Sequence, residues 1–323
     1  MNKSDSLCLI SGTSNRPLAL KISKILKVEL TPVEISHFKD GEIYIRIEES
    51  VRGKDVFIIQ STSKPVNDNL MELAIIIDAA RRASAKRVTA VIPYYGYARQ
   101  DRKAKPREPI TAKLVANLIV AAGADRVICF DLHANQIQGF FDIPMDHLKA
   151  GGVFTKYFNE KKMKDFVVVS PDIGAAKKSE KFASYLKAPL VIIHKKRTQR
   201  NEVESAFILG EVKGKICVVI DDMIDTAGTM TAAAKTLKEN GAKDVYMLAT
   251  HGIFSGPAIE RLSDTAIKEV IITDTINQED KKLPKKFKII SISEQLANVI
   301  EKINRDDSKS YLFTKGQKKI KEF

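Results

Sequence analysis

The sequence contains no tryptophan, and aromatic residues make up only 7% of its 323 positions. Proteins that bind single-stranded nucleic acid commonly interleave aromatic and basic side chains, and no stripe of that kind occurs here. No apolar run approaches the roughly 20 residues that a membrane-spanning helix needs, and Met1–Ser6 lacks the apolar stretch of a signal peptide. We therefore expect neither nucleic acid nor a membrane as a partner.

Cysteine is also scarce. The three cysteines, Cys8, Cys129 and Cys217, each lie inside an apolar run and share no spacing typical of a disulfide or a metal site. This pattern predicts buried, reduced side chains, and we expect a cytoplasmic enzyme.

Three common motifs are missing as well. The sequence has no G-x-x-x-x-G-K-[ST] phosphate loop, no G-x-G-x-x-G dinucleotide motif and no G-x-S-x-G nucleophile elbow. A P-loop nucleotide site, a dinucleotide fold and a serine hydrolase are therefore unsupported.

The composition is that of a large globular protein, with 44% hydrophobic and 29% charged residues, enough for two domains of ordinary size. The net charge of +13 is compatible with nucleic acid, a membrane surface or small polyanionic substrates, and charge alone does not choose among them.

Short apolar runs alternate with helical patterns along the chain, which predicts an α/β fold with mainly parallel sheets flanked by helices. The expected strands are 55–60, 87–93, 126–131, 166–170, 190–194, 216–220, 245–250, 269–273 and 288–291, and the expected helices are 69–83, 109–122, 175–186, 230–240 and 294–304.

A weak internal repeat pairs residues 53–61 with 214–222 and 85–88 with 242–245. Any two strand–helix–strand units look somewhat alike, which is the alternative explanation. We nevertheless expect two similar domains, 1–148 and 149–303, with a tail at about 304–323 that packs back on the first.

The most informative stretch is Ile216–Thr229, where an apolar run is followed by Asp221, Asp222 and a loop before the next helix. N–H groups at a helix start hold phosphate, and paired carboxylates accept bonds from sugar hydroxyls. An ordinary acidic strand end with a capped helix would explain the threonines but not the group of acids. We therefore predict a sugar-phosphate site made of Asp221, Asp222, Asp225, Thr226, Ala227, Gly228 and Thr229.

Other polar groups follow predicted strands, where sites gather in parallel sheets. Arg99 and Gln100 would hold a triphosphate and a purine edge, although basic loops are often only solvated. Phe38 beside Asp40, Gly41 and Glu42 would suit stacking on a base, although most such segments are surface turns.

His133 and Asp172 also follow strands and would ligate Mg²⁺ that is held mainly by phosphate oxygens. Lys195 and Arg197, in the basic segment 194–202, are candidate cations for a polyanionic transition state. The alternative is that this segment is a basic hairpin with no catalytic role.

Together these motifs resemble the ribose-phosphate diphosphokinases, also called phosphoribosyl pyrophosphate synthetases. The resemblance runs nearly end to end and is carried by 38–42, 97–103, 131–144, 170–174, 221–229, 250–257 and 310–313. It implies two phosphoribosyltransferase-like domains and transfer of the diphosphoryl group of ATP to the C1 hydroxyl of ribose 5-phosphate, giving AMP, with Mg²⁺ required.

The resemblance also implies roles for single residues. Lys195 and Arg197 would stabilise the transferred group, and Arg197 would join Asp221, Asp222 and residues 225–229 in holding ribose 5-phosphate. ATP would be held by Phe38, Asp40, Gly41, Glu42, Arg99, Gln100 and Asp101, and the metal by His133 and Asp172.

The same family implies a homo-oligomer, a hexamer built from dimers, with phosphate and ADP as effectors at a site matched by Arg52, Ser308, Ser310 and Phe313. Two positions depart from the family pattern: this chain has Ala175 where the family has Gly, and Lys178 where it has Arg. Lysine lacks the planar guanidinium group of arginine, which can form two parallel hydrogen bonds.

Two rival functions share part of this pattern. A phosphoribosyltransferase that consumes the activated sugar would need the 221–229 segment but not an ATP site. A non-catalytic regulatory subunit would lose its cations or carry an insertion near 194–204, and here Lys195 and Arg197 are present without one.

Overall fold

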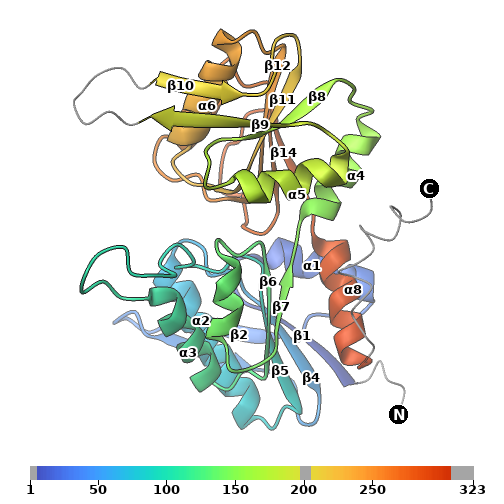
Figure 1. The fold of residues 1–323 in the computed structure, drawn as a ribbon. Helices are drawn as coiled ribbons and strands as arrows, with labels where there is room; N and C mark the ends of the chain where they lie inside the picture. The colour runs from blue at the N-terminus through green and yellow to red at the C-terminus, as the bar shows by residue number, and fades with distance from the viewer. Residues whose placement is uncertain (1–5, 197–204, 307–323) are drawn as a thin grey trace. The chain divides into compact units, whose positions relative to one another are not determined.

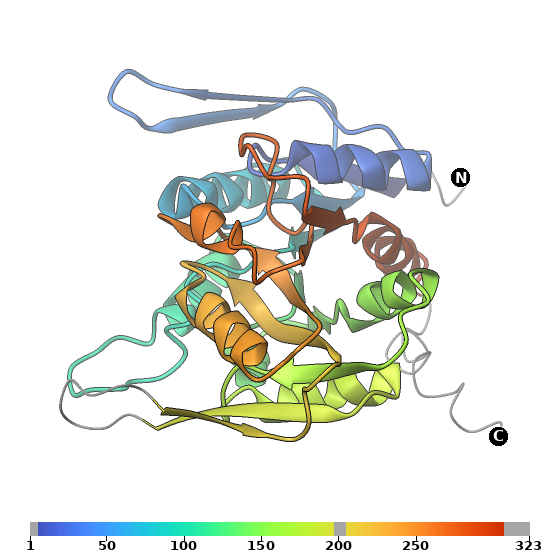
Figure 2. The same cartoon turned by 90° about the horizontal axis from the view of Figure 1, so that it is seen from above.

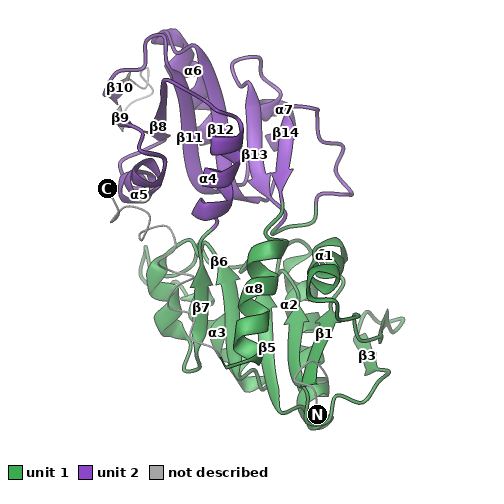
Figure 3. Cartoon of the chain, turned by 90° about the vertical axis from the view of Figure 1, so that its right-hand side faces the viewer, with its two compact units in different colours: residues 1–149, 275–277, 291–323 green, residues 150–274, 278–290 purple. Residues whose placement is uncertain are grey.

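The structure, a computed structural model, describes residues 6–196 and 205–306 of the chain. The chain forms two compact units (Figures 1 and 3). The first comprises Met1–Lys149, Thr275–Asn277 and Ser291–Phe323, and the second Ala150–Asp274 and Gln278–Ile290. None of the helices in the described residues is both long and apolar enough to span a bilayer.

The first unit contains a five-stranded sheet in the order β1-β4-β5-β6-β7, in which every pairing is parallel. Its strands are almost entirely buried, as expected for a parallel sheet with helices on both faces. The strands are β1 (Leu7–Ser11), β4 (Asp55–Ile59), β5 (Arg87–Ile92), β6 (Arg126–Phe130) and β7 (Met145–Leu148).

Helices cover both faces of this sheet (Figures 1 and 3). The apolar stripes of α2 and α3 form one core cluster with alternate strand residues, and α1 packs against α8. The helices are α1 (Arg16–Leu26), α2 (Val66–Arg82), α3 (Thr111–Ala121), the 3₁₀ helix η2 (Asn135–Phe140) and α8 (Ser293–Asn304).

A two-stranded antiparallel ribbon, β2 (Val33–His37) with β3 (Ile43–Ile47), lies at the edge of the first unit (Figures 2 and 3). Burial alternates along both strands, and the apolar positions pack against the core around α2. The ribbon therefore has a fixed inner face and an open outer face.

The second unit contains a seven-stranded sheet in the order β10-β9-β8-β11-β12-β13-β14, and only β10 is antiparallel to its neighbour. The strands are β8 (Phe166–Ser170), β9 (Leu190–Lys196), β10 (Ser205–Leu209), β11 (Ile216–Ile224), β12 (Asp244–Gly252), β13 (Glu269–Thr273) and β14 (Phe287–Ile290); the helices are α4 (Gly151–Glu160), α5 (Ala176–Leu186), α6 (Gly228–Glu239) and α7 (Ala258–Leu262).

Each unit is thus a mainly parallel sheet flanked by helices, and the predicted α/β class is confirmed. In the second unit α6 and α7 form a core cluster with β11, β12 and β13, while α4 and α5 pack together with α5 against β8. The predicted reduced cysteines are confirmed too, since all three are free and buried.

The last helix, α8, was expected in the second domain, 149–303, but it belongs to the first unit. Its buried apolar face packs against α1, and an ion pair that no local pattern reveals holds its last turn. Arg87 holds Asp55 through two bonds of 2.8 and 2.6 Å and also donates to the carbonyl of Ile303 at 2.7 Å. Asn304 donates to Asp55 at 3.0 Å, and Asp306 pairs with Arg87 at 3.0 Å. Asp55 raises the pKa of the Arg87 guanidinium, which keeps this anchor charged.

Candidate functional site

The tip of the β2–β3 ribbon presents an aromatic ring beside two carboxylates. Phe38 donates its N–H to the Glu42 carbonyl at 2.8 Å, and Gly41, at φ 95°, closes the turn through its own bond to Phe38. Asp40 accepts from the Glu42 N–H at 3.1 Å. The Phe38 ring is 55% exposed and meets Tyr44 edge to face, with centroids 5.9 Å apart. The aromatic surface is therefore held in place and open.

The loop after β5 carries the second group of predicted nucleotide contacts. The Gln100 side chain accepts from the Thr111 hydroxyl at 2.5 Å, and its carbonyl accepts from Ala112 N–H at 3.1 Å, so this residue anchors the start of α3. Asp101 accepts from Gln136 at 2.7 Å. Arg99, between these anchored neighbours and the buried Ala98, has an exposed side chain. The loop is thus fixed by its backbone and leaves a guanidinium at the surface.

His133 follows β6, as predicted, and its side chain is exposed. His147, which no sequence motif marks, is buried, and its Nε2 accepts the Leu132 N–H at 2.9 Å. Lys149 lies 2.8 Å from the same ring and 3.5 Å from Asp131. His147 therefore supports the turn that carries His133, a contact visible only once β7 is seen to pair with β6.

Asp172 follows β8 in the second unit, and its side chain is exposed. One carboxylate oxygen accepts the Ala175 N–H at 2.8 Å in the turn before α5, and Ser170 donates to the Asp172 carbonyl at 2.7 Å. Within the described residues no three His, Cys, Asp or Glu side chains form a metal-binding cluster. A carboxylate of this kind suits an ion such as Mg²⁺, which retains several waters and takes few protein ligands.

The strand end predicted at Ile220 is wrong, because β11 continues to Ile224. Asp221 pairs with Ala249 and Met223 with His251 in a regular parallel register, so both acids lie within the strand. Successive strand residues point to opposite faces, and the two carboxylates differ accordingly: Asp222 is only 4% exposed and Asp221 is half-buried. The acids therefore do not form a symmetric pair at a turn.

The turn itself lies three residues later and joins a strand to a helix as predicted, although the helix begins at Gly228 rather than at Met230. Asp225, Thr226 and Ala227 join β11 to α6, which begins at Gly228. Ala227 adopts a left-handed conformation at φ 62°, which turns the chain sharply into the helix. The first N–H groups of α6 have no intrahelical acceptor, and Thr226, Gly228 and Thr229 are exposed. This loop offers donors and a positive helix end to an anion.

The remaining predicted residues are less fully described. Lys195 lies on β9, which extends to Lys196 rather than ending at His194, and its backbone pairs with Ala206 of β10. Arg197, Ser308, Ser310 and Phe313 lie outside the described residues, and Arg52 is exposed in the turn before β4.

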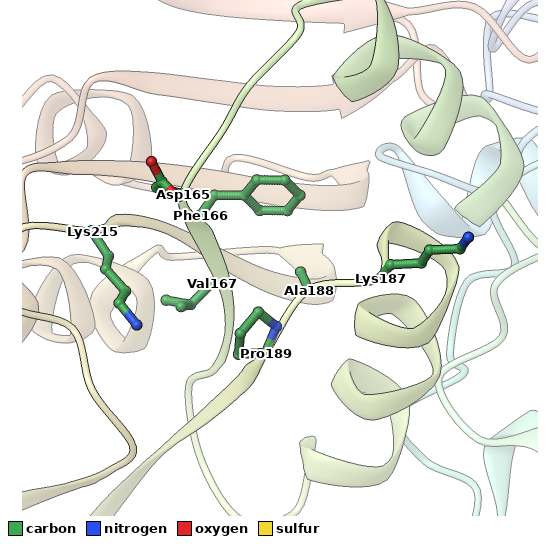
Figure 4. A pocket seen from close by; sticks show the side chains of 7 residues that line it. All are labelled: Asp165, Phe166, Val167, Lys187, Ala188, Pro189 and Lys215. Carbon is green, nitrogen blue, oxygen red and sulfur yellow. The ribbon is translucent and has the colours of Figure 1, made fainter.

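The second unit also contains a cavity of about 270 Å³ (Figure 4). Phe166 is the first residue of β8 and Lys215 immediately precedes β11, so the cavity lies at the amino edge of the sheet. Its polar side chains do not converge, since Lys187 points away from the others. The chemistry of the candidate site lies at the opposite edge.

Comparison with known proteins agrees with this geometry. Residues 7–123 match a family model described as the N-terminal domain of ribose phosphate pyrophosphokinase, and residues 201–314 match a phosphoribosyl synthetase-associated domain. The chain is 54% identical over 307 residues to the ribose-phosphate pyrophosphokinase of Fusobacterium nucleatum, covering 94% of this chain and 97% of that one. It is 52% identical to that of Bacillus subtilis, covering 96% and 98%.

A solved structure gives the same result. The phosphoribosylpyrophosphate synthetase from Mycobacterium smegmatis superposes with a TM-score of 0.88 at 47% identity, covering 93% of this chain and 99% of that one. Identity of this extent over nearly the whole of both chains shows that the protein belongs to the ribose-phosphate pyrophosphokinase family.

Proposed function

We propose that the two units divide the substrates of the family's reaction between them, ATP at the first and ribose 5-phosphate at the second. As a member of this family, the chain transfers the diphosphoryl group of ATP to the C1 hydroxyl of ribose 5-phosphate for nucleotide biosynthesis. The products are 5-phosphoribosyl 1-diphosphate and AMP. The observation that supports the division is that the open aromatic tip and the anion-binding loop occur in different units.

The proposed nucleotide site uses the ribbon tip and the loop after β5. Phe38 stacks on adenine, since its ring is exposed and its orientation is fixed by Tyr44. Asp40, Gly41 and Glu42 contact the nucleotide from the same turn. The phosphates are held from the other loop by Arg99, Gln100 and Asp101.

The proposed sugar-phosphate site is the end of β11 and the start of α6. The 5′-phosphate binds the N–H groups and hydroxyls of residues 225–229, where the helix dipole favours an anion. Asp221 and Asp222 accept bonds from the ribose hydroxyls, with Asp221 the more accessible of the two. Arg197 adds a cation from the segment after β9.

The residues present fit Mg²⁺ as the cofactor. His133 in the first unit and Asp172 in the second would each offer one donor to Mg²⁺ that is otherwise coordinated by phosphate oxygens and water. When bound, the ion neutralises charge on the phosphates. Lys195 and Arg197 stabilise the transferred diphosphoryl group, and the chain's remaining task is to align the C1 hydroxyl with the β-phosphorus and the departing AMP.

Regulation and assembly are proposed from the same family membership. Arg52, Ser308, Ser310 and Phe313 form an effector site for phosphate and ADP, and the chain assembles as a homo-oligomer, a hexamer built from dimers. A cytoplasmic location fits the three free cysteines. Neither nucleic acid nor a membrane is proposed as a partner.

One assay tests the proposed reaction. The chain is incubated with Mg²⁺, ATP and ribose 5-phosphate, and the nucleotide products are separated. We expect AMP together with 5-phosphoribosyl 1-diphosphate. Formation of ADP in place of AMP would reject diphosphoryl transfer in favour of an ordinary kinase, and no nucleotide product would favour a regulatory subunit.

A substitution tests the proposed catalytic cation. Lys195→Ala should lower kcat by about 100-fold or more, because it removes a charge from the transition state, while ATP binding largely persists. Lys196→Ala removes the same charge from the next position and serves as the control. Turnover that is equal in the two variants would remove Lys195 from the mechanism.

A further inference from the structure

The loop that joins β11 to α6 is supported by the segment that follows β12. The N–H groups of Ile253 and Phe254 both donate to the Ile224 carbonyl, at 2.9 and 3.1 Å, and the Ser255 N–H donates to the Asp225 carbonyl at 3.0 Å. These bonds fix the first residues of the loop. They do not reach the next peptide group, between Thr226 and Ala227.

That next peptide group is held by a side chain. Arg261, on the short helix α7, donates through Nη1 to the Thr226 carbonyl at 3.0 Å. A Cβ built on Gly228 would lie 3.7 Å from the same nitrogen, so the guanidinium lies along the loop where it enters α6. Arg261 forms no ion pair with a carboxylate of the described residues, which leaves the Thr226 carbonyl as the partner that fixes its position.

The direction of this peptide group matters for anion binding. In a trans peptide the carbonyl oxygen and the following N–H point in opposite directions, so holding the Thr226 carbonyl on one side presents the Ala227 N–H on the other. If the group turned over, a carbonyl oxygen would face the anion and repel it. Ala227 is at φ 62°, a conformation that costs energy for a residue with a side chain, and the contact from Arg261 adds to the bonds from Thr231 to the Ala227 carbonyl in holding it.

We propose that Arg261 is a positioning residue for the sugar-phosphate loop, which orients the Thr226–Ala227 peptide group so that its N–H faces the 5′-phosphate. Arg261 lies on the carbonyl side of that group and does not touch the substrate. This inference rests on the proposed ribose 5-phosphate site at residues 225–229.

The test compares variants of Arg261 in the full chain. Arg261→Met should raise KM for ribose 5-phosphate by about tenfold and change KM for ATP by less than about twofold, because only the sugar-phosphate loop loses a contact. Arg261→Lys, which keeps a donor and the charge, should recover most of the affinity. Lys235→Met removes an exposed charge from α6 without touching the loop and should have little effect on either KM.

A second variant separates orientation from charge. Glycine adopts positive φ without a steric cost, so Ala227→Gly in the Arg261→Met background should restore part of the affinity for ribose 5-phosphate if Arg261 acts by holding that conformation. An Arg261→Met variant that raises both KM values equally, or neither, overturns the proposal, as does the absence of any rescue by Ala227→Gly.

A further variant distinguishes a wrong assignment of the ribose 5-phosphate site from a wrong role for Arg261. Thr229→Glu places a negative charge in the loop itself and should abolish ribose 5-phosphate binding whatever Arg261 does. If Thr229→Glu has no effect, the site is elsewhere; if it acts and Arg261→Met does not, only the role of Arg261 is rejected. Circular dichroism and the urea midpoint check that each variant is folded.

Discussion

The two units repeat one strand–helix–strand motif, β4–α2–β5 in the first and β11–α6–β12 in the second, and the match extends to single backbone bonds. Gly53 and Gly214 both adopt positive φ, 71° and 73°, in the turn before the strand. Gly53 N–H donates to the Ser84 carbonyl at 2.9 Å, and Gly214 N–H donates to the Gly241 carbonyl at 2.8 Å. The repeat that the sequence indicates only weakly is therefore present in the backbone.

The two helices of this motif begin differently. Aligned by Ser84 and Gly241 at their ends, α2 and α6 bury matching positions, and Glu72 of α2 corresponds to Thr229 of α6. α2 has 17 residues and α6 has 12, so α2 places additional helical residues where the second unit has its loop. A carboxylate thus occupies the position of a proposed phosphate contact.

In the first unit this region is a closed polar network. Glu72, only 3% exposed, accepts from the Thr13 N–H and hydroxyl at 2.7 Å each and from Gln60 at 2.8 Å. Gln60, which corresponds to Asp221, also accepts from Ser14 at 3.0 and 2.7 Å. Glu72 and Gln60 are buried and bond to each other, while Ser14 is half-buried and Thr13 is exposed, and a network of this kind stabilises a fold. One motif therefore carries a polar network in one unit and the proposed binding loop in the other.

The largest effect is expected when Thr229 of the second unit is replaced by glutamate, the residue at the corresponding position of the first unit. Thr229→Glu should lower kcat/KM for ribose 5-phosphate by at least about 100-fold, about 3 kcal/mol, because a carboxylate would repel the phosphate and a hydroxyl donor is lost. The helix should tolerate the change, since a negative charge is favourable in the first turn. The measurement is steady-state kinetics with each substrate varied in turn.

The control for this variant is Thr229→Gln, which has similar size without the charge and should cost about tenfold. KM for ATP should stay unchanged in both. An equal loss of kcat/KM in the two variants would mean that the size of the side chain matters rather than its charge. The comparison with Glu72 would then say nothing about electrostatics.

The second prediction concerns the closed network of the first unit. A Cβ on Gly12 would lie 2.3 Å from Gln60 Oε1 and 2.6 Å from Glu72 Oε1. Neither side chain can move without breaking its bonds, so Gly12→Ala should lower the free energy of unfolding by about 2–3 kcal/mol. Urea unfolding measures it.

Gly139→Ala is the matched control, because a Cβ there meets nothing within 4 Å and the residue has no positive φ. It should change the free energy of unfolding by less than about 0.5 kcal/mol. A Gly12→Ala variant as stable as this control would mean that the network yields easily, and that the first unit is not closed in the way described.

The same contrast explains what the sequence could predict. Local patterns predicted the parallel strands, the turn at residues 225–227 and the glycine turn beside Phe38, because periodicity and turn residues act over a few positions. The start of α6 was predicted two residues too late. The end of β11 was misplaced because apolarity stops at Asp221, although the strand's register with β12 continues. The half-exposed ribbon and the antiparallel partner of β9 were not expected either.

Contacts between distant segments were out of reach altogether. Arg87 and Asp55 hold the last turn of α8 in the first unit, and His147 and Arg261 support the loops. Each is a single side chain that meets a backbone group from another part of the chain. No spacing in the sequence marks such a contact, since it follows from how the strands are ordered in the sheet.

The smallest effect provides the strictest test of the repeat. Gly53 and Gly214 hold the same left-handed turn, and a Cβ on either would meet nothing within 4 Å, so the only penalty for alanine is the positive φ itself. Gly53→Ala and Gly214→Ala should each destabilise the unit that contains it by about 1 kcal/mol. Hydrogen exchange in the strand that follows each turn, β4 or β11, reports the two units separately. Because both turns pair with the end of the following helix, the two losses should agree within about 0.5 kcal/mol. A large loss of stability in one unit and none in the other would mean that the two glycine turns contribute differently to stability. The units would then share a topology but not the energies of its matching contacts.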